Sequence, residues 1–344
     1  MKQSEKDDLF AAHLPGVLAY HQKMLADGVR NRLLYKAIKQ HVTSDTAFLD
    51  IGAGTGVWAI LAAKLGAKRV VAVEIEECLM PVIYKLAKEN GVADKIEIIH
   101  ANANDLNIRG KFDVIVCELF GSDAIGLETV RSFVYVRDRF LAPAGVLIPQ
   151  KLALMAAPLH FKHSLDRVAT GLPLTTEFFK STRLNYGLNL GLAERNGILL
   201  LAEPMKLVEI DFREIKEAPS LENLTATWNV KKLKKANAIL TYSQSTFTNA
   251  IKLDSLDSQS WSASVIEFTP FEWKSGELQY NVSLNTQIGK WSVSLISHPE
   301  VKPQTFSPIF AFTRIRMAQQ TTPHLKIQPH KTPSIKTNSK AEKK

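Results

Sequence analysis

The apolar positions in the first 150 residues follow the helical period and then alternate between short runs and helical patterns. Between residues 21 and 38 apolar side chains recur every three or four positions, which predicts one amphipathic helix ahead of the first strand. Strands are then predicted at residues 47–51, 70–74, 96–99, 112–117 and 146–148, and helices at 56–65, 77–90 and about 127–141. Short apolar strands separated by helices indicate an α/β fold with a parallel, Rossmann-like sheet covered on both faces.

After Pro149 the pattern changes to an alternation of apolar and polar residues, which is typical of half-buried strands. The clearest segments are residues 207–212, 225–230, 238–242, 261–268, 278–284 and 291–296. No long helical pattern separates them, so we expect a mostly antiparallel β domain. The predicted organisation is a helical segment at 1–45, a Rossmann-like domain at 46–150, the β domain at 151–317 and a tail at 318–344.

Composition and charge indicate a globular chain with a basic C-terminal tail. The 344 residues are 45% hydrophobic and 22% charged, which is ordinary for a globular chain. The net charge is +9, but residues 318–344 contain six Lys and one Glu, which leaves about +4 for the rest. We interpret this basic, Pro-containing tail as disordered, either a solubilising segment or a handle for an acidic partner such as nucleic acid.

Location is also an expectation from composition. The first residues lack the basic and then apolar pattern of a signal peptide, and the sequence contains no run of 18 apolar residues. Cys78 and Cys117 are too few for a disulfide framework. We therefore expect a cytoplasmic, reducing location, no membrane partner and, from the spacing of His and acids, no metal.

A glycine-rich turn carries the strongest local motif. The predicted first strand runs into Gly52, Gly54 and Gly56, with Asp50 two residues before the first glycine. A dinucleotide fingerprint would need its third glycine where Val57 stands. The variant found here is typical of methyltransferases, in which the turn approaches the amino-acid part of S-adenosyl-L-methionine. Asp50 would then face the cofactor ammonium.

Two further residues fit a nucleoside cofactor. Glu74 ends the second predicted strand, where its carboxylate can accept two hydrogen bonds from a ribose diol. Asn104 follows the third strand and can contact an adenine edge. The ordered set of Asp50, the glycine turn, Glu74 and Asn104 indicates a nucleoside cofactor far more specifically than the glycines alone do.

At this point the sequence resembles the protein arginine methyltransferase family. The residues HQKMLADGVR at 21–30, FLDIGAGTGVWAILAAKLGAKRVVAVE and FDVIVCELFGS carry the resemblance, which covers residues 20–150 almost without gaps. It implies that the first helical segment folds over the cofactor, with His21 near it and Arg30 on its carboxylate. It also implies that residues 151–317 form a β-barrel-like domain with an arm, around LNYGLNLGL, that makes a homodimer.

The same resemblance implies transfer of a methyl group to the guanidinium of a protein arginine. In the family two carboxylates from one loop hold the acceptor, and Glu118 matches the first. The second usually follows nine positions later, where Leu127 stands, so either Glu128 or Asp123 is expected to serve, or the site has one acid. Without the family, Glu118 would be read as a buried salt bridge or a cap contact.

A second departure concerns a loop of the β domain. The family often carries Thr-His-Trp there, with the histidine bonded to an N-terminal acid, whereas this chain has Gln259, Ser260 and Trp261. Trp261 is read equally well as a core aromatic. Because of these departures two alternatives stay open: a methyltransferase for another amine or a small molecule, and a cofactor-binding module with impaired catalysis.

Overall fold

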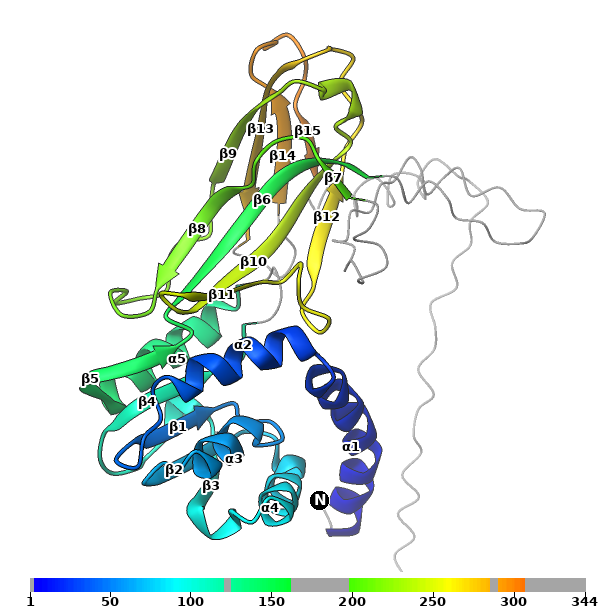
Figure 1. Ribbon diagram of the computed structural model, residues 1–344. Helices are drawn as coiled ribbons and strands as arrows, with labels where there is room; N and C mark the ends of the chain where they lie inside the picture. The colour runs from blue at the N-terminus through cyan, green and yellow to red at the C-terminus, as the bar shows by residue number, and fades with distance from the viewer. Residues whose placement is uncertain (1–2, 121–124, 162–197, 285–289, 307–344) are drawn as a thin grey trace, which may run out of the picture.

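The computed structural model describes residues 3–120, 125–161, 198–284 and 290–306, and shows two structural halves (Figure 1). A helix-covered sheet forms the half that follows the N-terminal helices, and the strands from β6 onward form the other. The predicted arm at residues 184–192 and the tail at 318–344 lie outside the described residues. Within the described part, no helix is both long and apolar enough to cross a membrane.

The N-terminal helical region consists of two helices, so the prediction of one helix over 21–38 is wrong. Helix α1 spans Gln3–Leu25 and α2 spans Gly28–Lys39. The break falls at Asp27, whose carboxylate caps α2 by accepting a 3.1 Å hydrogen bond from the backbone N–H of Arg30. An Asp followed by Gly is a common signal for a helix start, and here it overrides a continuous apolar period.

The first sheet matches the predicted parallel arrangement. Its strands lie in the order β3-β2-β1-β4-β5, and every neighbouring pair is parallel. The bounds of these elements are β1 Ala47–Ile51, α3 Val57–Lys64, β2 Arg69–Glu74, η1 Glu77–Leu79, α4 Met80–Glu89, η2 Ala93–Lys95, β3 Ile96–His100, η3 Ala103–Asp105, β4 Phe112–Cys117, α5 Leu127–Phe140 and β5 Leu141–Ile148. The expected α/β fold is thereby confirmed.

Two apolar cores cover the faces of this sheet. Phe48 of β1 packs with α2, α3 and α4, whereas Leu49 and Ile51 pack on the opposite face with α5. Residues of the β domain complete both cores, Trp261 on the first face and Phe212 on the second. The two halves of the chain therefore share buried surface, and burial of these aromatic side chains fixes their relative position.

The described part of the β domain is antiparallel, as predicted. One sheet pairs β11, β10, β6 and β7 in that order, with β12 beside β10 and β8 beside β6, and a second has the order β15-β14-β13-β9. The bounds are β6 Lys151–Phe161, β7 Ile198–Leu200, β8 Met205–Asp211, β9 Leu224–Val230, η4 Leu233–Lys235, β10 Ala238–Thr248, β11 Ile251–Asp254, β12 Ala263–Glu267, β13 Gly276–Ser283, β14 Lys290–Leu295 and β15 Gln304–Phe306.

The long strand β6 was not among the predicted segments. Most of its residues are buried, so its sequence KLALMAAPLHF shows no clean alternation of apolar and polar positions. Another prediction, a strand that starts at Trp261, is two residues too early because β12 begins at Ala263. Trp261 instead ends the loop that joins β11 to β12, and this loop reaches the site described next.

Candidate active site

A cavity of about 600 Å³ lies between α1, the glycine turn, the end of β4 and the loop before β12. Of the predicted site residues, those that line it are His21, Arg30, Gly52, Gly54, Glu74 and Glu118. Loop residues 259–262 contribute from the β domain, and Tyr20, Met24 and Trp58 from the helices. Its volume is within the range of ordinary ligand sites.

The glycine turn depends on backbone conformations that L-residues rarely adopt. Gly54 has φ +59°, and a Cβ at this position would stand 2.6 Å from Cε1 of His21. Gly56, with φ +78°, precedes α3 as its N-cap residue. The sequence therefore needs glycine at Gly54 for two reasons, backbone conformation and the close approach of the His21 ring.

Glu74 holds the turn after β2 together. Its Oε2 accepts a 2.6 Å hydrogen bond from the N–H of Gly54, and its Oε1 accepts from the N–H groups of Ile75 and Glu76 at 2.8 and 2.9 Å. The carboxylate is buried, with 6% of the residue exposed. These bonds fix the Glu74 carboxylate at the cavity wall. Its remaining lone pairs can accept hydrogen bonds from the two hydroxyl groups of a diol.

Asp50 lies behind the glycine turn and is not among the residues that line the cavity. Its Oδ2 accepts a 3.1 Å hydrogen bond from the N–H of Ala59, while its Oδ1 is buried without a partner among the described residues. Burial, with the nearby charges of Glu74 and Glu118, raises the pKa of Asp50 to about 7 although the Ala59 bond opposes this.

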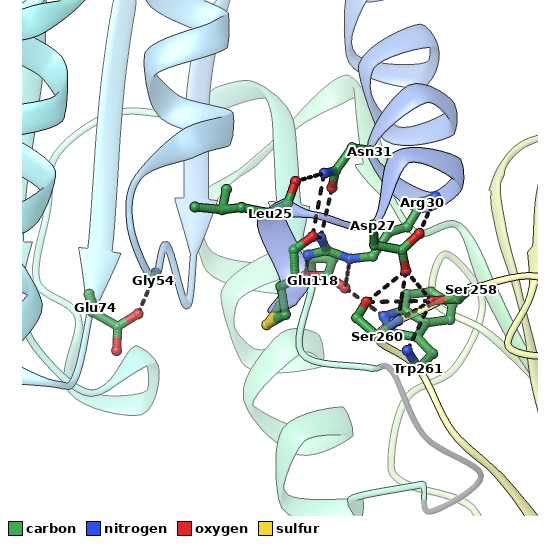
Figure 2. Close-up of polar contacts among 11 residues, drawn as sticks. Leu25, Asp27, Arg30, Asn31, Gly54, Glu74, Glu118, Ser258, Ser260 and Trp261 are labelled. Atoms are coloured by element: carbon green, nitrogen blue, oxygen red, sulfur yellow. Dashed lines mark hydrogen bonds and ion pairs between the residues drawn. The ribbon is translucent and has the colours of Figure 1, made fainter. Parts of the chain in front are cut away.

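Arg30 and Glu118 form a buried ion pair (Figure 2), and both line the cavity together with Trp261; we call the part of the cavity that these three residues line its inner end. Nε of Arg30 donates to Oε1 of Glu118 at 2.8 Å, and Nη2 donates to Oε2. The Nη1 group donates to the carbonyl of Met24 and to Oδ1 of Asn31, at 3.1 and 2.8 Å. This two-point contact is the geometry in which a carboxylate binds any guanidinium.

Trp261 contributes a third donor to Glu118. Its indole Nε1–H donates to Oε1 of Glu118 at 3.0 Å, and its ring packs edge-on against Phe247 with centroids 6.3 Å apart. Trp261 is therefore a core aromatic and a site residue at once. The sequence allowed Trp261 to be either a site residue, as in the family, or a core aromatic, and the structure shows both.

Asp27 links α2 to the loop before β12, and sequence reasoning did not single it out. Its Oδ2 accepts hydrogen bonds from Ser258 Oγ at 2.5 Å, from the N–H groups of Gln259 and Ser260 at 2.8 and 2.9 Å, and from Ser260 Oγ at 2.8 Å. We call these residues, Asp27 with 258–260, the loop anchor. Ser260, expected at the position of the family's histidine, thus bonds to an N-terminal acid in its place.

The loop anchor changes the acidity of Asp27. Burial by itself would raise the pKa of this carboxyl group, but the hydrogen bonds from Ser258, Ser260 and the Arg30 backbone outweigh burial and lower it. The pKa of His21 is also lowered, because burial outweighs the attraction of Glu74 and Glu118. At neutral pH the cavity therefore contains a neutral imidazole near two carboxylates.

The remaining predicted residues do not converge on Glu118. Glu128 lies in the first turn of α5, its side chain is 82% exposed, and it pairs with Arg131. Asp123 lies outside the described residues. Asn104 is exposed on η3, where its N–H bonds to Oδ1 of Asn102, and it does not line the cavity. In the described part of the chain, Glu118 is thus the one carboxylate at the inner end.

Comparisons with known proteins show which sequences are similar to this chain. A family model for ribosomal protein L11 methyltransferase (PrmA) matches residues 32–154. A probable protein arginine N-methyltransferase 6.2 from Oryza sativa subsp. indica is 29% identical over 227 residues, 64% of this chain and 57% of that protein. Protein arginine N-methyltransferase 6 from Danio rerio is 31% identical over 172 residues, 49% of this chain and 47% of its own length. The chain spans about half the length of these curated relatives.

Solved structures show the same fold. The Trypanosoma brucei PRMT1 enzyme-prozyme heterotetrameric complex with AdoHcy aligns with a TM-score of 0.68 at 20% identity, over 83% of this chain and 96% of that chain. Arabidopsis thaliana protein arginine methyltransferase 10 aligns with a TM-score of 0.67 at 18% identity, over 84% and 98%. Fold and matches together show a Rossmann-like sheet of the methyltransferase type, followed by a β-barrel-like domain. Within this class, the relatives that the chain resembles in sequence are protein arginine N-methyltransferases.

Proposed function

We propose that this protein is an S-adenosyl-L-methionine-dependent methyltransferase that transfers a methyl group to the guanidinium of a protein arginine. One observation carries the proposal. Glu118 is a buried carboxylate at the inner end of a nucleoside-sized cavity, and it already binds one guanidinium, that of Arg30, through both oxygens. The relatives of the chain by sequence are named protein arginine N-methyltransferases.

The residues at the cavity fit the proposed cofactor. Gly52 and Gly54 let the backbone approach closely, and a Cβ added at Gly54 would stand only 2.6 Å from Cε1 of His21. Glu74 offers a buried carboxylate for a ribose diol, and Arg30 offers a guanidinium for a carboxylate. When bound, the cofactor supplies an electrophilic sulfonium methyl group. The AdoHcy in the Trypanosoma brucei complex supports the same assignment.

Glu118 would orient the acceptor and stabilise its positive charge. A guanidinium held by this carboxylate presents a terminal nitrogen in a fixed direction, which lowers the entropic part of the barrier. The carboxylate also attracts the charge that the acceptor carries during transfer. Trp261 keeps Oε1 of Glu118 in place, and the loop anchor keeps Trp261 at the site because Trp261 N–H donates to Ser258 Oγ at 2.9 Å.

Arg30 gives the proposal a specific order of events. Both oxygens of Glu118 are engaged by Arg30, so an acceptor guanidinium needs at least one of them released. Arg30 would hold the carboxylate of a bound cofactor through the same two-point contact, and in doing so it would release Glu118. Glu118 would therefore be free for the acceptor only when Arg30 is engaged by the cofactor.

A second candidate function rests on Glu128. Because this residue faces solvent and pairs with Arg131, a single described carboxylate is available at the inner end of the cavity. One carboxylate is enough for an amine or a small-molecule acceptor, where a general base suffices. The absence of a second described carboxylate beside Glu118 also supports the third alternative, a cofactor-binding module that does not transfer the methyl group.

The acceptor class is tested by label transfer. The protein is incubated with methyl-labelled S-adenosyl-L-methionine and an arginine-rich peptide, a matched peptide with lysine at every arginine, or a mixture of free metabolites. We expect label in the arginine peptide, recovered as methylarginine after hydrolysis. Label found only in the lysine peptide or the metabolites would establish the second candidate, and cofactor binding without label in any acceptor would establish the third.

The oligomeric state, the partners and the cellular location of the protein are also part of the proposal. We propose a homodimer formed through the β domain, since the relative from Trypanosoma brucei is an oligomeric complex. A protein substrate with an accessible arginine and an acidic partner for the basic tail are the other proposed contacts. A reducing, cytoplasmic location fits Cys78 and Cys117, which are both free thiols in the described structure.

A further inference from the structure

Three side chains with metal-binding atoms meet beside the mouth of the cavity. They are His13 of α1, Glu76 of the turn after β2, and Cys78 of η1. Their ligand atoms all lie within 4.8 Å of one another, and Nε2 of His13 is 3.4 Å from Oε2 of Glu76. In the part of the chain that the structure describes, no other group of three such residues occurs.

The local structure leaves these atoms available. Glu74 fixes the turn by accepting the N–H groups of Ile75 and Glu76. Glu76 is the N-cap residue of η1, but its side chain makes no capping hydrogen bond, so its carboxylate is left for His13. Cys78 is buried, with 3% exposed, whereas the side chains of His13 and Glu76 are 60% and 49% exposed. A solvent route therefore reaches the group from one side.

We propose that His13, Glu76 and Cys78 bind a Zn²⁺ ion. An imidazole nitrogen, a carboxylate oxygen and a thiolate sulfur are the three ligand types that this ion takes, at about 2.0–2.3 Å each. Tetrahedral ligands at these distances stand about 3.5 Å apart, close to the 3.4 Å between His13 and Glu76. Sγ of Cys78 lies within 4.8 Å of both other ligand atoms and would move closer on binding, and a water would take the fourth position.

The charges of the ligands also suit a divalent cation. A thiolate and a carboxylate neutralise the two charges of Zn²⁺, and the imidazole remains neutral. The thiol proton of Cys78 is released to solvent on binding, so affinity rises with pH. A thiolate ligand favours Zn²⁺ over Ca²⁺ or Mg²⁺, which prefer oxygen ligands.

The position of the site gives the ion a structural consequence. His13 belongs to α1, whereas Glu76 and Cys78 belong to the sheet half, and Glu76 also lines the cavity. Bound Zn²⁺ would join α1 to the turn after β2 at the cavity mouth. It would thereby hold α1 in its present position beside the proposed cofactor site.

Another histidine–carboxylate pair provides a matched control. Nδ1 of His298 lies 3.1 Å from Oε1 of Glu300, but this pair is not part of a three-ligand group in the described structure. Cys117 is a second buried thiol, with 1% exposed, that is likewise in no such group. Substitution of His298 or Cys117 should therefore leave metal binding unchanged.

Cobalt titration tests the site without reference to activity. The full-length, metal-stripped protein, reduced with a phosphine, is titrated with Co²⁺ and followed for the near-ultraviolet charge-transfer band of a cobalt thiolate, and Zn²⁺ is then added to displace it. We expect one equivalent to give the band. Cys78→Ser should abolish it, and His13→Ala should weaken binding by about 100-fold or more, since loss of a supporting partner alone costs 10- to 100-fold.

The controls decide the result. Cys117→Ser and His298→Ala should each keep the band and the affinity of the unchanged protein. The proposal is overturned if no thiolate band forms, or if the band persists in Cys78→Ser. It is also overturned if His13→Ala binds as tightly as the unchanged protein. Circular dichroism of each variant separates loss of a ligand from loss of the fold.

Discussion

The two ends of the cavity are built in different ways. At the cofactor end, Gly54 and Glu74 come from one βαβ segment and are joined by a 2.6 Å hydrogen bond. At the proposed acceptor end, Asp27, Glu118 and Trp261 come from three distant segments and meet only in the folded chain. The first end is therefore a local motif, whereas the second depends on how the β domain docks on the sheet.

Asp27→Asn should have the largest effect on this docking. The substitution replaces one acceptor oxygen by a donor, which faces the donors of Ser258 or Ser260 or that of Arg30, so buried groups lose their partners. We expect the free energy of unfolding to fall by about 2–3 kcal/mol. Urea unfolding measures this loss, and Asp45→Asn, at an exposed position, is the control. An unchanged midpoint would show that the loop anchor does not join the two halves.

The pH dependence of this effect has a definite sign. The pKa of Asp27 is lowered in the folded state, so its contribution to stability is present above its unfolded value and is lost as pH falls through the folded value. The difference between the unchanged protein and Asp27→Asn should therefore shrink in acid, below about pH 4. A difference that grows in acid would contradict the assigned hydrogen bonds.

Gly54→Ala tests the cofactor end, with a smaller effect on stability. The positive φ of Gly54 should cost about 1–2 kcal/mol of stability when Ala replaces it. The same strain applies to Gly66→Ala, with φ +96°, but a Cβ at Gly66 meets nothing within 4 Å. Calorimetric titration should show weaker S-adenosyl-L-methionine binding for Gly54→Ala alone. Equal loss in both variants would mean that backbone strain, rather than approach to the cofactor, sets the affinity.

Asp50 provides a gradual effect, a change in the slope of stability against pH that is small within any one pH unit. Its folded pKa, about 7, lies above the ordinary value of 3.8, so the folded state binds the proton more tightly between these values. Stability should fall as pH rises through this window, by at most about 1.4 kcal/mol per pH unit. Asp50→Asn should remove this slope in thermal unfolding between pH 5 and 7, whereas Asp94→Asn, an exposed control, should keep it. An identical slope in Asp50→Asn would place the titration elsewhere.

The sequence predicted the cofactor end well because its signals are local. The strand 47–51 and the glycine turn follow each other directly, and the parallel order of β1 and β2 then brings Glu74 onto Gly54. Asp50, Gly56 and Asn104 were predicted as well but do not line the cavity, and an exposed 3-10 turn carries Asn104 away from it. A residue that follows a strand reaches a site only if its turn directs the side chain inward.

The acceptor end could be predicted only in part. Glu118 at the end of an apolar strand was a clear signal, but its pairing with Arg30 and Trp261 needs the fold. Asp27 carried a signal, an Asp-Gly pair inside a helical pattern, that also marks the break between α1 and α2. Glu128 was placed by spacing along the chain, and the start of α5 at Leu127 turns it toward Arg131 instead.

The most direct test of the proposed mechanism compares Glu118→Gln with Glu128→Gln. Methyl transfer to an arginine peptide and the Kd for S-adenosyl-L-methionine are measured on each variant, with thermal unfolding in the presence of cofactor to show that both are folded. Glu118→Gln should lower transfer by roughly 100- to 1,000-fold, as loss of one preorganised electrostatic group does, with the Kd nearly unchanged. Glu128→Gln should transfer normally. Retained transfer in Glu118→Gln, or an equal loss in Glu128→Gln, would contradict the account.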